Sequence, residues 1–185
     1  MTEKQAIYYE LLVLRCRRGQ KDAFQELVRA WEKRLFYYIR RLVDDEQDAW
    51  QVLQDTWLKV ISNIKKLRQP RKLPGWLYEI ARNTAIGHLR KKYKRQVLFE
   101  PDTNVRNVED TASNIAFDDA QQVHFGLAKI SLNHREVLTL FFLQDLTIEE
   151  IAQVLKVPTG TVKSRLFHAK RALKAVLQKE AENYE

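Results

Sequence analysis

Residues 147–177 constrain the fold most, because they predict two helices joined by a very short turn. Thr147 precedes a periodic apolar run and has Glu150 three residues later, which predicts a capping box at a helix start. Pro158 cannot continue that helix but suits the first turn of another, so residues 157–160 are predicted to form the turn. Two helices joined in this way indicate a helix-turn-helix module.

A further helix is predicted directly upstream. Asn133 is a residue of N-cap type, and Glu136 stands three residues later, which predicts a second capping box. Apolar residues follow at helical spacing, so this helix is expected to be a buried support for the module. Its apolar residues are Val137, Leu138, Phe141 and Phe142.

The last helix of the module has two chemically distinct sides. One side is an apolar stripe made of Val162, Leu166, Ala169, Leu173 and Leu177. The other positions combine cations, hydroxyls and a phenylalanine, which can contact phosphates, base edges and thymine methyl groups. The alternative is an amphipathic helix with a solvated basic face. The candidate DNA-reading residues are Thr161, Lys163, Ser164, Arg165, Phe167, His168 and Arg171.

The composition indicates a folded chain with a polyanionic partner. The 185 residues are 45% hydrophobic and carry a formal net charge of +8. Cys16 is the single cysteine, which excludes an intramolecular disulfide and a cysteine-rich zinc site. The four histidines lack metal-ligand spacing, and no nucleophile or phosphate-loop motif occurs. We therefore expect no enzyme activity, no cofactor and no metal, and a cytoplasmic location without membrane insertion.

The N-terminal half predicts a bundle of helices. Periodic apolar residues run from Ile7 to about Val43, with a break at Gly19 and a second helix opened by Asp22. Another helix is predicted over residues 44–67. Its buried face is predicted to contain Ala49, Val52, Leu53, Thr56, Val60 and Ile64. Its other face is acidic and aromatic, and either a solvated face or a protein-docking surface fits it. That face contains Asp48, Gln51, Asp55, Trp57 and Leu58.

A fourth helix, from about residue 73 to 95, has a row of chemically suggestive residues. Its core stripe is predicted to be Leu77, Ala81, Ala85 and Leu89. Trp76, Asn83 and Arg90 fall seven residues apart and so lie roughly in line, as a base-stacking, base-pairing and phosphate-binding set would. Lys91 and Lys92 continue a basic run that favours a nucleic-acid phosphate patch. The alternatives are a core role for Trp76 and complementation of the helix dipole by the cations.

The two helical parts are separated by a polar, acidic stretch. Residues 96–114 contain few apolar side chains, which predicts a linker that spans roughly 70 Å when extended. An ordered loop on one compact domain is the alternative. We therefore expect an all-α chain with a helical bundle at 1–95, a flexible acidic linker at 96–114 and a helix-turn-helix domain at 115–185, opened by a helix over 115–130.

With these motifs in place, the chain resembles a bacterial sigma-70 family RNA polymerase sigma factor of the extracytoplasmic-function (ECF) type. DAWQVLQDTWLKV resembles the segment that binds the clamp helices of core polymerase, and LPGWLYEIARNTAIGHLRKK resembles the melting and −10 recognition segment. GTVKSRLFHAKRAL resembles the −35 reader. The resemblance covers nearly the full length, with the bundle as region 2 and the helix-turn-helix domain as region 4.

The resemblance implies partners and roles. The core polymerase, through its β and β′ subunits, and promoter DNA are the implied partners, and an anti-sigma factor is a further candidate. Polymerase would be faced by Asp48, Gln51, Gln54 and Asp55. The melted −10 strand would be held by Trp76, Asn83, Arg90, Lys91 and Lys92, and the −35 duplex would be read by the candidate DNA-reading residues.

Two rival functions are compatible with parts of the sequence. A free-standing helix-turn-helix repressor or activator would bind a palindromic duplex as a dimer. An adaptor would bind polymerase or another sigma factor without reading DNA. Trp76 and Asn83 beside a basic run fit strand trapping better than dimerisation, and the last helix is equipped to read DNA.

Overall fold

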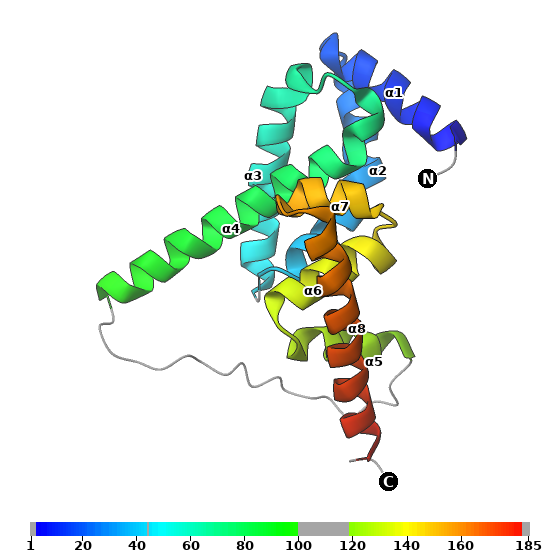
Figure 1. The fold of residues 1–185 in the computed structure, drawn as a ribbon. Coiled ribbons are helices and arrows are strands. Elements are labelled where there is room, and N and C mark those ends of the chain that lie inside the picture. The colour runs from blue at the N-terminus through cyan, green and yellow to red at the C-terminus, as the bar shows by residue number, and fades with distance from the viewer. Residues whose placement is uncertain (1–2, 44, 100–118, 183–185) are drawn as a thin grey trace.

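The computed structural model describes residues 3–43, 45–99 and 119–182, and in these ranges every regular element is helical, which confirms the all-α class (Figure 1). The first helices are α1 (Glu3–Arg17), α2 (Lys21–Arg40), α3 (Glu46–Asn63) and α4 (Leu73–Phe99), with 3₁₀ turns η1 (Ile64–Lys66) and η2 (Pro70–Lys72) before α4. The later elements are α5 (Asp119–Lys129), α6 (Leu132–Leu138), the π-helical turn η3 (Thr139–Leu143), α7 (Ile148–Leu155) and α8 (Thr159–Glu182). No helix in these ranges combines the length and apolarity that crossing a bilayer requires.

The core of the N-terminal bundle is centred on three aromatic side chains. The ring of Tyr78 lies 6.0 Å from that of Trp31 and 5.2 Å from that of Tyr38, and both pairs meet edge to face. All three side chains are buried. Since edge-to-face pairs favour one relative orientation, this cluster fixes how α4 packs on α2.

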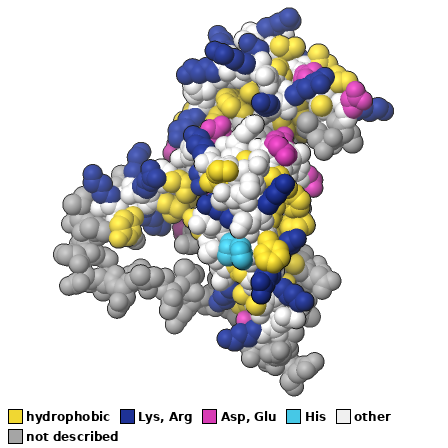
Figure 2. Space-filling model, in the orientation of Figure 1, with side chains coloured by type: hydrophobic (Ala, Val, Ile, Leu, Met, Phe, Trp, Pro, Cys, Tyr) yellow, Lys and Arg dark blue, Asp and Glu magenta, His cyan; other side chains and the backbone are white. Residues whose placement is uncertain are grey.

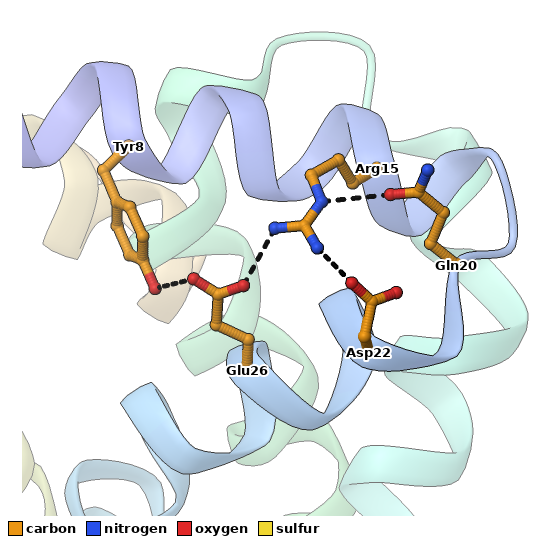
Figure 3. A network of polar contacts seen from close by, with 5 residues as sticks. All are labelled: Tyr8, Arg15, Gln20, Asp22 and Glu26. Carbon is orange, nitrogen blue, oxygen red and sulfur yellow. Dashed lines mark hydrogen bonds and ion pairs between the residues drawn. The ribbon is translucent and has the colours of Figure 1, made fainter.

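The junction of α1 and α2 is held by a polar network around Arg15 (Figure 3). The Arg15 Nη1 atom donates to Glu26 Oε2 at 2.9 Å, its Nε donates to Gln20 Oε1 at 3.0 Å, and it also pairs with Asp22. The Tyr8 hydroxyl donates to Glu26 Oε1 at 2.6 Å, and this hydrogen bond raises the pKa of Tyr8 to about 12. The network ties the first helix of the chain to the second.

The predicted turn between the last two helices is present, displaced by about one residue. Thr147 and Glu150 form the predicted capping box, which starts α7. Lys156 ends α7 in the left-handed region with φ of 56°, and its N–H bonds back into the helix. Helix α8 then begins at Thr159 rather than after residue 160, and Pro158 accepts its first backbone hydrogen bond at 2.9 Å.

The helix upstream of this module differs from the prediction in two respects. Ser131, not Asn133, is the N-cap of α6, because α6 already begins at Leu132. The following turn is π-helical, with the N–H of Gln144 bonded to the carbonyl of Thr139 at 3.1 Å. This wider turn alters the periodicity assumed for an α-helix, so Phe142 is 54% exposed instead of buried.

The two helical parts pack against each other, with α7 lying against α4 (Figure 1). Helix α4 continues to Phe99 and so includes the first four residues of the predicted linker, while residues 100–114 lie outside the described residues. The N-terminal residues of the predicted helix at 115–130 also lie outside them, and α5 begins at Asp119.

A buried carboxylate lies at the centre of the contact between the two parts. Glu136 of α6 is 1% exposed and accepts hydrogen bonds from the Tyr38 hydroxyl at 2.8 Å and from Arg82 Nε at 2.7 Å. Arg82 Nη2 lies 3.4 Å from the second carboxylate oxygen. Glu136 therefore does not complete a capping box. Removing one partner of such a pair costs about 3–5 kcal/mol, because the other charge is left buried alone.

A second polar cluster joins α5 to α2. The Nδ1 atom of His124 lies 2.8 Å from the Tyr37 hydroxyl and 2.8 Å from Arg41 Nη2. A guanidinium can only donate, so this ring nitrogen must be unprotonated to accept. Burial and the Arg41 charge accordingly lower the pKa of His124 from its ordinary value of 6.5.

The His124 cluster predicts a loss of stability on mild acidification. Below about pH 6.5 the unfolded chain binds a proton at His124 that the folded chain does not, so the free energy of unfolding falls as pH falls, by at most about 1.4 kcal/mol per pH unit. Solvent around this half-buried side chain reduces the effect. Urea unfolding between pH 8 and 5 should show a smaller decline for His124→Gln than for the wild type. Equal slopes for His124→Gln and the wild type would contradict the assignment.

Candidate nucleic-acid interface

The first candidate surface is one side of α4. Trp76, Asn83 and Arg90 are spaced by seven residues, nearly two helical turns, and so share a side. Asn83 and Arg90 are exposed, whereas Trp76 is half-buried and packs against the core. We call this row the α4 row. An amide and a guanidinium are therefore open to solvent beside an indole held in place by the core.

Lys92, one of the cations of the predicted strand-binding set, lies on a different side of α4 from the α4 row. Lys92 follows Asn83 by nine residues, about 900° of helical rotation, and therefore faces roughly the opposite side of α4. There its Nζ atom lies 2.7 Å from Asp48 Oδ2, while His88 Nε2 lies 3.0 Å from Oδ1 of the same carboxylate. Lys91 lies between the two sides and is exposed.

Asp48 consequently faces α4 rather than the outer side of α3. Hydrogen bonds from Lys92 and then from His88 lower the pKa of the Asp48 carboxyl below its ordinary value of 3.8. The side chains of residues 90–94 of α4 are exposed, and the helix extends away from the body of the molecule (Figure 1). The Asp48 bridge thus holds the base of this projecting basic segment.

The second candidate surface is the outer face of α3. Gln51 and Gln54 are exposed, and Gln51 Nε2 donates to Asp55 Oδ1 at 3.2 Å. Leu58 is 65% exposed and Ile61 is 48% exposed beside them. Leu58 and Ile61 each follow one of the glutamines by seven residues, a spacing that places them on the same helix face and that is visible in the sequence. Leu58 was predicted to belong to this surface, whereas Ile61 was not.

One of the two tryptophans of α3 is placed differently from the prediction. Trp57 was expected on the outer face, but it is buried in the core with 9% exposure. Trp50 is exposed instead and stacks on Phe36 of α2, with ring centroids 4.1 Å apart. The exposed apolar residues of α3, Trp50, Leu58 and Ile61, therefore lie among amide and acidic groups, as in a protein-docking face.

The third candidate surface is α8. Val162, Leu166 and Ala169 are buried and anchor the helix, which confirms the stripe over its first turns. Most of the candidate DNA-reading residues lie on the exposed side: Lys163, Ser164, Phe167, His168 and Arg171. Thr161 and Arg165 are half-buried at its edge.

The exposed side of α8 is chemically mixed. Phe167 is 55% exposed, with the Arg171 guanidinium 5.7 Å from its ring centroid and the His168 ring 5.3 Å away. Histidine, hydrophobic and basic side chains lie side by side over α8 in Figure 2. Aromatic, imidazole and cationic groups on one rigid helix can contact bases and phosphates together. Among the described residues no three His, Cys, Asp or Glu side chains gather as a metal site would require.

Comparisons with known proteins agree with this arrangement. The family model for Sigma-70 region 2 matches residues 27–95, and that for Sigma-70, region 4 matches residues 126–175. The RNA polymerase sigma-H factor of Pseudomonas aeruginosa is 33% identical over 178 residues, which cover 90% of this chain and 92% of that protein.

The chain belongs to the sigma-70 family of RNA polymerase sigma factors. The ECF RNA polymerase sigma factor SigW of Bacillus subtilis is 26% identical to this sigma factor and is covered over 92% of its length, with 88% of this chain aligned. The sigma factor RpoE of Bartonella quintana, solved in complex with the anti-sigma factor NepR, superposes with a TM-score of 0.71 at 23% identity, covering 84% of this chain and 96% of that one. This sigma factor is therefore a transcription initiation factor of the ECF type.

The Asp48 bridge predicts a specific local effect. Asp48→Asn should lower the free energy of unfolding by only about 0.5–1 kcal/mol, because Lys92 is nearly half exposed and water screens the pair. Amide hydrogen exchange should quicken along residues 88–94 of α4. The wild-type contribution should be present above about pH 3.8 and disappear as pH falls through the lowered pKa.

Asp55→Asn serves as the matched control for this prediction. It removes a carboxylate from the same helix whose hydrogen-bond partner, Gln51, belongs to α3 itself, and it should leave exchange in α4 unchanged. An equal increase in both variants would show that Asp48 does not hold the projecting segment.

Proposed function

We infer that this sigma factor binds bacterial core RNA polymerase and directs it to promoters by reading a −35 duplex with α8 and trapping a melted −10 strand along the α4 row. The observation that supports this function most strongly is the exposed, chemically mixed side of α8 on a helix anchored by Val162, Leu166 and Ala169. No covalent chemistry is involved.

Reading of the −35 element is attributed to the exposed side of α8. Lys163 and Arg171 are cations suited to phosphates and guanine edges, and Ser164 and His168 can donate or accept at base edges. Phe167 can contact a thymine methyl group. Thr161 and Arg165, at the half-buried edge, would contact the flanking backbone.

Strand trapping is attributed to the α4 row. Unpairing and unstacking a base costs a few kcal/mol, while stacking on an aromatic side chain returns about 1–3 kcal/mol. Trp76 supplies the aromatic surface, Asn83 an amide for a base edge, and Arg90 a phosphate partner. Lys91 adds charge beside the row, and Lys92, paired with Asp48, contributes by holding the segment.

Polymerase binding is attributed to the outer face of α3. We assign Gln51, Gln54 and Asp55 to contacts with the β′ clamp helices, with Leu58 and Ile61 as apolar contacts beside them. Asp48 would act there only through its bridge to α4. An anti-sigma factor is a further partner class, as with RpoE of Bartonella quintana.

Run-off transcription tests the function directly. Pooled genomic fragments of the source bacterium would be transcribed by its core polymerase with and without this protein. Transcripts that require the protein and share two spaced upstream elements are expected. If none appear while the protein alone shifts a discrete duplex, the chain is a free-standing helix-turn-helix regulator instead.

Asn83→Ala should impair melting without impairing polymerase binding. Losing one base-edge contact, worth about 1–3 kcal/mol, should reduce open-complex formation about fivefold or more. Permanganate footprinting measures melting, and native gel shift of the polymerase complex measures binding. Asn133→Ala, an exposed position in α6, is the control. Parallel loss of melting and polymerase binding would remove Asn83 from the strand-binding role.

The combined substitution of Lys163 and Phe167 by Ala should change −35 preference. These side chains lie one helical turn apart on the exposed side of α8, so their loss removes adjacent base contacts. Selection from promoters randomised at the −35 element measures the preference. Lys174→Ala, farther along α8, should weaken binding uniformly without changing preference. An unchanged preference in the double variant would place readout elsewhere.

A further inference from the structure

The packed arrangement brings the two proposed DNA-binding helices too close together for a promoter. Helix α7 contacts both α4 and α8, and packed helices lie about 8–10 Å apart, so near α7 the axes of α4 and α8 lie within roughly 20 Å. Elements centred at −10 and −35 are about 25 base pairs apart, roughly 85 Å of duplex at 3.4 Å per pair. The two helical parts must therefore separate before both elements can be bound.

Glu136 makes a buried polar contact between the two helical parts. Its carboxylate, on α6, takes the Arg82 guanidinium of α4 at 2.7 and 3.4 Å and the Tyr38 hydroxyl of α2 at 2.8 Å. Tyr78 of α4 also donates to the Gln144 side chain after η3. Lys156 and Glu79 make an exposed pair at 3.2 Å across the same boundary.

The arginine in this pair belongs to the strand-binding region. Arg82 is the neighbour of Asn83 in the sequence, and its side chain leaves α4 about 100° around the helix from it. Two guanidinium nitrogens approach two oxygens of one carboxylate, which is the geometry that arginine also uses for a phosphate. The side chain of Arg82 is only 20% exposed, so it cannot bind the Glu136 carboxylate and a DNA phosphate at the same time.

We propose that Glu136 is an internal competitor for single-stranded DNA: in the closed form it occupies Arg82, and on opening Arg82 binds a phosphate of the melted strand next to the α4 row. The inference rests on the proposed function and adds a DNA-binding residue and a means of regulation to it. It predicts that the closed form of the free chain binds the strand more weakly than the open form does.

The test uses the full chain without polymerase. Glu136→Gln removes the charge while keeping the shape, and Glu149→Gln makes the same change in net charge at an exposed position of α7. Tyr38→Phe is a second way to weaken the contact without changing charge. A fluorescein-labelled 12-nucleotide single strand of mixed sequence is the probe for anisotropy, small-angle scattering reports the radius of gyration, and circular dichroism verifies the helical content.

Glu136→Gln is expected to raise the radius of gyration and tighten single-strand binding at least fivefold, with Tyr38→Phe changing both in the same direction and Glu149→Gln changing neither. Adding Arg82→Gln to Glu136→Gln should abolish the gain and reduce the slope of log affinity against log salt by about 0.7, the value for one phosphate contact on a single strand.

Two results would overturn the inference while leaving the proposed function intact. One is a wild-type chain that directs run-off transcription although Glu136→Gln neither expands it nor tightens single-strand binding. The other is expansion without tighter binding, which would show that Arg82 does not contact the strand. A wild-type chain that directs no transcription would instead overturn the proposed function, and the role of Arg82 with it.

Discussion

The carboxylate of Glu136 is the interaction on which the relative position of the two helical parts depends. A charge that is 1% exposed is stable only with partners for its oxygens, and both partners, Tyr38 and Arg82, come from the other part of the chain. Burial also raises the pKa of Tyr38, with the Glu136 charge adding to the shift, so its hydroxyl stays a donor. A docking of α6 that lost Tyr38 and Arg82 as partners would leave this charge buried alone.

Local signals predicted the C-terminal module well. The capping box at Thr147 and the buried stripe of α8 are properties of residues close in sequence, and the structure has both. The π-helical turn was not predicted, because the apolar spacing was interpreted with the period of a regular α-helix. Phe142 was misplaced for that reason.

Contacts between elements that are far apart in the sequence could not be predicted from local sequence patterns. Glu136 was interpreted as half of a capping box because Asn133 stands three residues before it, whereas its partners are 98 and 54 residues away. Lys92 was grouped with Asn83 by sequence proximity, although helical rotation turns it towards Asp48. The roles assigned to Gln51, Asn83 and Lys163 remain predictions, because they concern partners outside the chain.

The π-helical turn has a consequence for how this chain can vary. The π-helical turn at Thr139–Leu143 contains one residue more than an α-helical turn. The side chains between this turn and α7 therefore point in directions shifted by one residue. Deleting a single residue there would restore an α-helix and rotate Gln144 by about 100° away from Tyr78. The length of this segment therefore determines whether Gln144 reaches Tyr78, so a deletion here would cost this hydrogen bond, whereas a conservative substitution within the turn would keep it.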